Sequence, residues 1–237
     1  MNDFFNFDEP NFIFNGVNAL VDMGCIIEKE LPDIQAKPRI DEITVIGRSG
    51  TLSEWHGDYE TYNLDVGKVS IPYENLEDVK RWLTGYGKLI THNDRDKYMT
   101  AIPSFSTEVK FENEWGMFYT FNLTFHCQPF KRKVNEQFIL LKGGVSVFNS
   151  GSVVSYPLLK VDMNSSDLTI LCNNAELKVN NLTKGLVEID CEKGMVLQNG
   201  KFVPSIGEWF DLVPGENKIS ITGNYSSATL LMRSLWV

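Results

Sequence analysis

The alternation of apolar and polar residues over residues 117–127 restricts the fold of this chain more than any other feature. In "MFYTFNLTFHC" every odd-numbered position from Met117 to Cys127 is apolar or aromatic, and most even-numbered positions are polar. Successive side chains of a strand point to opposite faces, so this period of two indicates a strand with one buried face. The run "SFSTEVKF" (residues 104–111) alternates in the same way, and "ENEWG" separates the two runs. Together they predict a β-hairpin over residues 104–128.

Two other segments in the first half of the chain carry strand and turn signals. Asn15-Gly16 lies between apolar runs, which is a strong indication of a tight hairpin. The segment "RIDEITVIGRSGTLSEWHGDYETYNLDV" (residues 39–66) is typical of a strand, a glycine-rich turn and a second strand. Its expected buried positions are Ile40, Ile43, Val45, Leu52, Tyr62, Leu64 and Val66.

One helix is predicted over residues 75–84. Asn75 is a favourable N-cap, and acidic residues in the first turn precede basic residues, as the helix dipole favours. The apolar residues recur at helical spacing on one narrow face, which suits packing against a sheet. These residues are Leu76, Val79, Trp82 and Leu83.

The second half of the chain consists of short apolar runs separated by turn residues. The runs are "PLLKVDM", "LTILC", "ELKV", "LVEIDC", "GMVL", "KISIT" and "ATLLM", and the breaks between them include "NSS", "EKG", "PGEN" and "GNYSS". About seven strands at this spacing predict a jelly-roll-like β-sandwich. We therefore expect a mainly β chain with a helix-containing domain over residues 1–133, a linker over 134–144 and a second domain over 145–237.

Composition excludes several classes of protein. The net charge of −9 argues against a nucleic-acid interface, which needs a basic face. No run of about 18 apolar residues suggests a membrane span, and the first twelve residues lack the pattern of a secretory signal. The widely spaced Cys25, Cys127, Cys172 and Cys191 form no C-x-x-C pair, so we expect reduced, buried thiols.

The histidines do not predict a reactive or metal-binding site. His126 and Cys127 are neighbours on the predicted strand, so they point to opposite faces and cannot form a nucleophile–base pair. His56 lies among acidic residues and His92 lies beside "NDRD", but neither has the ligand spacing of a known metal site. We expect His56 to be a solvated loop residue. The "NDRD" after His92 resembles the start of a calcium loop but lacks its central glycine and late glutamate.

No catalytic motif emerges from the rest of the chain. The sequence has no Walker or Rossmann glycine pattern and no G-x-S-x-G elbow. We therefore expect an interaction or structural role rather than an enzyme, with no cofactor and no metal. One alternative is a carbohydrate-binding module that recognises a bacterial cell-wall polymer through aromatic side chains. Its candidate residues are Trp209, Tyr225 and Trp236.

The order and spacing of several short motifs indicate a family. These are "FNG" (14–16), "RIDEITVIGRSGTL" (39–52), "WLTGYGKL" (82–89), "FHCQPF" (125–130), "SYPLLKV" (155–161), "LVEIDCEKGMVLQNG" (186–200) and "LVPGENKISITG" (212–223). In this order, over nearly the whole chain, they resemble the distal tail (Dit) proteins of bacteriophages with long, non-contractile tails.

This resemblance implies a fold and a role. The expected fold is an N-terminal β-sandwich with one α-helix, followed by a galectin-like β-sandwich. The expected role is a hexameric ring at the virion tail tip, assembled in the bacterial host cytoplasm. The ring would join the tail tube and tape-measure protein to a tail-associated lysin or fibre, as the hub of host adsorption. Some relatives hold receptor-binding proteins through long insertions in the second sandwich. Residues 145–237 leave little room for one, which favours a simple hub.

A closed ring needs a segment that reaches the neighbouring subunit. The hairpin around residues 36–52 is our candidate, because it combines apolar residues, mixed charge and a glycine turn. An ordinary internal hairpin is an equally good interpretation of the same pattern. The candidate interface residues are Pro38, Arg39, Ile43, Val45 and Arg48.

Overall fold

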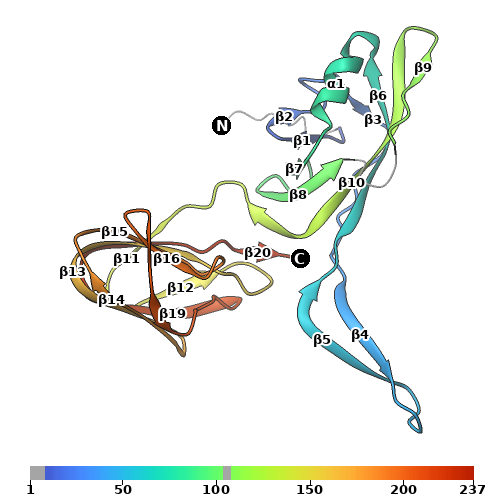
Figure 1. The fold of residues 1–237 in the computed structure, drawn as a ribbon. Coiled ribbons are helices and arrows are strands. Elements are labelled where there is room, and N and C mark those ends of the chain that lie inside the picture. Colours follow the sequence, from blue (N-terminus) through green and yellow to red (C-terminus); the bar gives the residue numbers. More distant parts are fainter. Residues whose placement is uncertain (1–8, 104–107) are drawn as a thin grey trace. The chain divides into compact units, whose positions relative to one another are not determined.

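The computed structural model describes residues 9–103 and 108–237, which form two compact units that divide between Val134 and Asn135 (Figure 1). Nearly all of the regular structure is antiparallel β-sheet, so the predicted mainly β fold is confirmed. No helix in the described part of the chain is long and apolar enough to cross a membrane.

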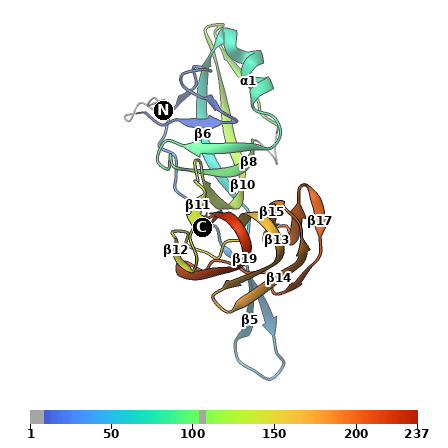
Figure 2. The ribbon, with the colours of Figure 1, turned by 90° about the vertical axis from the view of Figure 1, so that its left-hand side faces the viewer.

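The first unit is a curled antiparallel sheet (Figure 2). Its strand order is β2-β1-β7-β8-β10-β6-β3, and β9 is added beside β10 (Figure 1). Two further strands, β4 and β5, pair only with each other among the described residues. The elements are β1 (Phe12–Phe14), β2 (Val17–Asn18), β3 (Ile26–Ile27), β4 (Pro38–Thr44), β5 (Thr51–Tyr59), β6 (Tyr62–Pro72), a 3-10 helix (Tyr73–Asn75), α1 (Leu76–Trp82), β7 (Gly87–Thr91), β8 (Lys97–Pro103), β9 (Glu112–Glu114) and β10 (Phe118–Lys133).

The core of the first unit is built around aromatic rings. Phe12 and Phe14 on β1 lie 5.2 and 5.4 Å from the ring of Phe125 on β10, measured between centroids. The helix closes this cluster, because Trp82 stacks on Phe12 and its indole N–H donates to the carbonyl of Phe14 at 2.9 Å. Phe121, Leu123, Phe125 and Cys127 are buried, so the predicted buried face is confirmed over these residues, whereas Met117 at the hairpin turn is exposed and Tyr119 is half-buried.

The start of the helix differs from the expected cap. Asn75 precedes α1, but its side chain makes no capping hydrogen bond. Instead, the side-chain amide of Asn75 donates to the carbonyl of Met23 at 3.0 Å, and the 3-10 turn leads directly into the helix. The asparagine therefore fixes the segment before β3 onto the helix, a long-range contact that sequence spacing cannot reveal.

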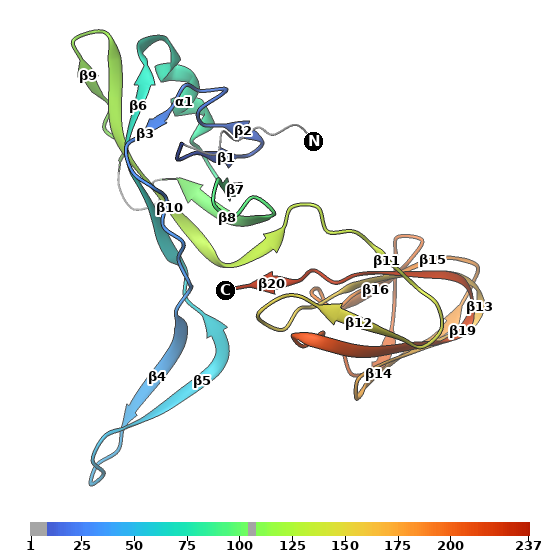
Figure 3. The ribbon, with the colours of Figure 1, turned by 180° about the vertical axis from the view of Figure 1, so that it is seen from behind.

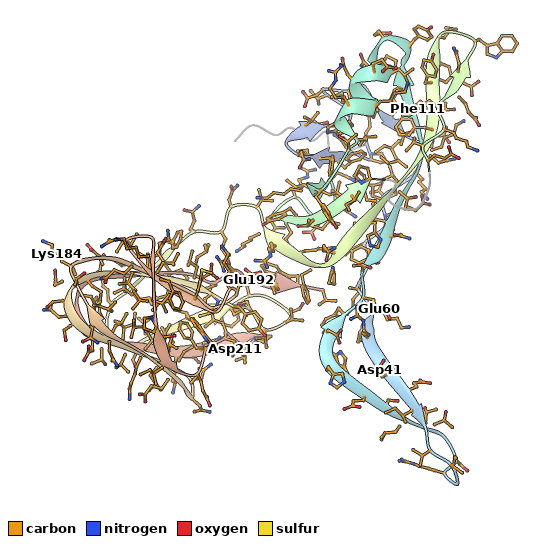
Figure 4. All side chains as sticks on the ribbon, in the orientation of Figure 1. Asp41, Glu60, Phe111, Lys184, Glu192 and Asp211 are labelled. Carbon is orange, nitrogen blue, oxygen red and sulfur yellow. The ribbon has the colours of Figure 1, made fainter. Side chains whose placement is uncertain are left out.

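The two hairpins predicted in this unit have different outcomes. Asn15 and Gly16 both have positive φ, 53° and 83°, and join β1 to β2 as predicted. The second hairpin is displaced, because the expected loop residues 112–114 form β9 and the turn is the pair Trp115-Gly116. Residues 104–107 of its expected first strand lie outside the described residues, and Phe111 instead packs its ring 4.7 Å from that of Phe121 (Figure 4).

The second unit contains β11 to β20. Its main path is β11-β19-β13-β15-β16-β17, with β12 beside β19, β14 beside β13, and β18 beside β14. The elements are β11 (Ile139–Leu141), β12 (Val145–Asn149), β13 (Leu158–Cys172), β14 (Ala175–Leu182), β15 (Gly185–Asp190), β16 (Met195–Gln198), β17 (Lys201–Val203), β18 (Ser205–Gly207), β19 (Gly215–Leu231) and β20 (Leu235–Trp236). The inward side chains of these strands form a separate apolar core.

Two of the expected strand breaks in this unit are bends within continuous strands. "NSS" (164–166) lies inside β13 and "GNYSS" (223–227) lies inside β19, and the two stretches pair with each other through shifts of register. The side chain of Asn224 bonds to Asn164 and Ser165 at this point. Turn-forming residues on two paired strands thus bend the pair instead of ending it. The segment expected to be a linker, residues 134–144, also contains β11, which pairs with β19.

Candidate subunit interface

The pair β4–β5 with its connecting turn, residues 38–59, is here called the arm (Figure 3). Its strands are antiparallel, with Ile43 opposite Leu52 and Ile40 opposite Trp55, and a bulge follows Pro38. An isolated two-stranded hairpin is only marginally stable in water. The outer edges of both strands pair with no other strand among the described residues, so the arm has backbone and side chains available to a partner.

Apolar side chains on the arm are exposed in the single chain. Ile40, Ile43, Val45 and Leu52, which we expected to be buried, are between 40% and 48% exposed. The expectation was wrong because no second layer from the described part of the chain covers these residues, whereas Leu64 and Val66, farther along the same segment, are buried in β6. Trp55, at 51%, adds a large aromatic ring to the set. Apolar groups of this size that lack an internal partner mark an interaction surface.

Charge on the arm also favours a partner. Asp41 and Glu54 lie directly opposite each other in the strand pair, and like charges at such positions destabilise a hairpin (Figure 4). Near the base, Arg39 forms an ion pair with Asp58 at 2.8 Å. Arg48 lies in the exposed turn, where its backbone N–H donates to the carbonyl of Val45. The predicted interface residues all lie on the arm, on β4 or in the turn that follows it.

The base of the arm is held by aromatic contacts. The Trp55 indole N–H donates to the carbonyl of Asp58 at 2.9 Å, and its ring meets Tyr59 edge-on at 5.7 Å. Tyr59 in turn meets Phe130 of β10 at 5.6 Å. These contacts tie the arm to the sheet from which it emerges, and they leave the turn end exposed.

The chain that leads into the arm, residues 28–37, is here called the strap, and it is fixed to the β7–β8 loop. Glu30 lies 2.5 Å from Nε2 of His92, and the carbonyl of Leu31 accepts from Asn93. Asp33 bonds to the ammonium group of Lys131 at 2.6 Å, and Lys131 also contacts Asp94 at 3.1 Å. The side chain of His92 is therefore largely buried and holds the strap against the β7–β8 loop.

The charged cluster beneath the strap has shifted pKa values. Burial alone would raise the pKa of Asp94, but hydrogen bonds from Lys97 and Lys131, with their positive charges, outweigh it and lower this pKa. Burial would likewise lower the pKa of Lys131, yet hydrogen bonds to Asp33 and Asp94 raise it. A lowered carboxyl pKa contributes stability above the unfolded value of about 4 that is lost as pH falls through the folded value.

We expect Asp94→Asn to reduce the unfolding free energy of the first unit at pH 6 by about 1 kcal/mol, since the cluster is partly screened by solvent. The variant should also show a flatter decline of stability between about pH 5 and pH 3 than the wild type. Urea denaturation at several pH values measures both effects. Asp96→Asn is the matched control, because Asp96 is exposed and contacts the same Lys97. Equal acid sensitivity of wild type and Asp94→Asn would contradict this account.

The histidine–cysteine pair is separated as strand geometry predicts. Cys127 is fully buried in the core, whereas the Nδ1 atom of His126 lies 3.0 Å from the side-chain oxygen of Asn63 on the opposite face. All four cysteines are buried and free, as expected. Burial raises the pKa of the Cys127 and Cys25 thiols to about 12, so both are neutral near pH 7.

Histidine, cysteine and carboxylate side chains form no metal-binding group within the described ranges. Glu54 comes within 3.9 Å of His56, and both are exposed on the arm.

The three aromatic residues of the carbohydrate alternative lie on different elements. Trp209 follows β18, Tyr225 lies within β19 and Trp236 lies in β20. Tyr225 is partly buried and packs against the core of the second unit. A sugar platform needs flat rings exposed side by side, so these three residues stay a prediction of the carbohydrate alternative.

Sequence reasoning missed the full extent of the arm and several of its apolar residues. The arm runs to Tyr59, and Ile46 and Trp55 belong to its exposed set. One signal was present in the sequence. Ile40 and Ile43 are three residues apart, so in a strand they point to opposite faces and cannot both face one core.

Comparison with known proteins finds a solved structure with the same fold over nearly the whole chain. No protein-family model and no curated protein matches the sequence. The structure, however, has the fold of a phage hub adsorption protein. It matches the crystal structure of the Dit protein of phage SPP1 (gp 19.1), described as a paradigm of the hub adsorption apparatus in phages that infect Gram-positive bacteria. The TM-score is 0.78 at 14% identity, over 96% of this chain and 99% of the SPP1 chain. The resemblance to Dit proteins seen in the sequence is thus confirmed at the level of the fold.

Proposed function

We propose that this chain is a structural protein of a bacteriophage or prophage tail, the distal tail hub, and that six copies close into a ring at the tail tip. The ring would join the tail tube and tape-measure protein to a tail-associated lysin or fibre and to any receptor-binding proteins. It would assemble in the bacterial host cytoplasm. The chain would act by binding other proteins, with no catalysis and no cofactor.

The observation that carries the proposal is the arm. It is a two-stranded extension whose outer edges pair with no other described strand, and its exposed apolar residues include Ile43 and Val45. A closed ring is built from heterologous contacts, in which one surface of each copy binds a different surface of the next. A projecting arm suits such a contact, because each copy both gives an arm and receives one.

The fold supports the same role. The likeness to SPP1 Dit spans both units and nearly all of both chains, so it covers more than one common β-sandwich. Fold alone does not establish function. The fold and the arm together favour the hub over the carbohydrate-binding alternative, because Tyr225 packs against the core and is only partly exposed.

Electron microscopy of the purified full-length chain tests the proposal. We expect negatively stained samples at micromolar concentration to contain closed rings of uniform diameter. The same preparation, incubated with purified bacterial cell-wall polysaccharide, should sediment no more protein than the buffer control. Monomers that sediment with the polysaccharide would overturn the hub assignment in favour of the carbohydrate-binding module.

A further inference from the structure

An apolar groove lies at one end of the sheet of the first unit. It has a volume of about 460 Å³ and lies between β3, the end of β6 and the start of β10. Ile26 on β3 is 62% exposed there, and Phe118 on β10 is also exposed. The groove is lined by Gly24, Ile26, Glu28, Ser70, Ile71, Pro72 and Phe118.

The groove adjoins an open sheet edge. Among the described residues β3 pairs only with β6, through Ile26 opposite Ser70 and Ile27 opposite Val69. An unpaired strand edge offers backbone groups to an incoming strand, and apolar pockets beside it hold the side chains of that strand. The groove therefore suits an extended segment with apolar side chains.

The arm of the same chain leads away from this groove. It continues into β6 at Tyr62, whereas β3 and the groove lie at the opposite end of β6, at Val69 to Pro72 (Figure 3). At about 3.3 Å per residue, the ten residues from Tyr62 to Pro72 separate the two ends by about 30 Å. Donor and receiver surfaces at opposite ends of one sheet are the arrangement that a heterologous contact requires.

The two surfaces also match in chemistry. The arm carries exposed Ile43, Val45 and Leu52, and the groove is mostly apolar. The arm turn contributes the basic Arg48, and the groove contributes the acidic Glu28, whose exposed carboxylate lies 3.6 Å from the ammonium group of Lys68. This charge complementarity favours one direction of insertion, with the turn of the arm toward Glu28.

We propose that the groove formed by β3, β6 and β10 receives the arm of a second copy of this chain. The inference rests on the proposed ring and identifies its receiving surface. The apolar side chains near the arm turn occupy the groove beside Ile26, and the outer edge of β3 takes up backbone hydrogen bonds from an arm strand. Each copy thereby gives its arm to one neighbour and accepts the arm of the other.

Three variants, each altered on one surface of the chain only, test this contact. Ile26→Lys places a charge in the groove, and Val21→Lys is the matched control, since Val21 is 63% exposed and does not line the groove. Ile26→Lys should reduce the fraction of chains in rings about ten-fold or more, while Val21→Lys assembles like the wild type. The third variant, Ile43→Asp with Val45→Asp, disables the arm. Circular dichroism melting should show all three folded as stably as the wild type.

Mixing the groove variant with the arm variant distinguishes the arm–groove contact from any other contact between copies. The groove variant keeps its arm and the arm variant keeps its groove, so an equimolar mixture can form one contact and no more. Analytical ultracentrifugation of the mixture at about 50 μM should show one-to-one dimers, with neither variant dimerising alone. Ile26→Cys mixed with Val45→Cys should also cross-link through a bismaleimide, because the native cysteines are buried.

The outcomes distinguish the groove assignment from the ring itself. Rings formed by Ile26→Lys at the wild-type level would overturn the groove as receiver, assign it to a different occupant and leave the hub proposal intact. A mixture that stays monomeric would also overturn the contact. Wild-type chains that form no ring under any of these conditions would overturn both proposals.

Discussion

Replacing Ile43 and Val45 by aspartate is expected to abolish ring formation while leaving both units folded. The two side chains are exposed on the arm of the single chain, so their loss removes no core contact. Burial of each in a subunit contact contributes about 1.5–3 kcal/mol, and a buried, unpaired carboxylate adds a further cost. Each arm makes one contact per copy, so the penalty recurs at every contact in the ring.

The measurement is size-exclusion chromatography with light scattering, together with thermal melting. The double variant should elute as a monomer, and its unfolding free energy should lie within about 0.5 kcal/mol of the wild type, as for other surface changes. Val21→Asp serves as control because Val21 is exposed on the same unit but outside the arm. Rings that persist in the double variant would refute the assignment of the arm to the interface.

Phe125→Ala is expected to destabilise the first unit by about 3–5 kcal/mol, which is the usual cost of emptying a buried phenylalanine site. Phe125 is fully buried between Phe12 and Phe14, and the helix residue Trp82 packs on the same two rings. Loss of this ring leaves a cavity that the three aromatic neighbours cannot fill without moving. A change of this size is a large fraction of the stability of a typical domain.

Calorimetry of the full chain measures this effect. The two units have separate apolar cores, so we expect two transitions, of which only the one belonging to the first unit moves. Phe202→Ala is the control, because Phe202 is exposed on the second unit and its loss should move neither transition measurably. A loss below about 1 kcal/mol for Phe125→Ala would show that the aromatic cluster does not form the core.

The local sequence pattern predicted the structure correctly where a single segment determines which of its residues are buried. The alternation through Phe121, Leu123 and Phe125 predicted which face of β10 is buried, and Asn15-Gly16 predicted its hairpin. The apolar face of α1 also packs on the core as predicted, with Val79 fully buried. In each case one short segment contains both the strand or helix signal and the residues that satisfy it.

The local sequence pattern gave the wrong prediction where a segment far away in the sequence determines burial or strand pairing. Ile43 and Leu52 are residue types common in core strands, but within residues 9–103 and 108–237 of one chain no second layer covers the arm. If the covering surface belongs to another copy, no single-chain reasoning can place it. The bends at Asn164 and Asn224 are a second example. Each stretch on its own has the sequence of a turn, and pairing with the other stretch keeps it within a strand.

A cryo-electron microscopy reconstruction of the purified assembly tests the central claim most directly. The account predicts a closed ring of six copies, in which the arm of each copy, residues 38–59, lies against the next copy and buries Ile43 and Val45. A reconstruction in which the copies meet through other surfaces, with the arms in solvent, would contradict the account, as would particles of single chains at every concentration.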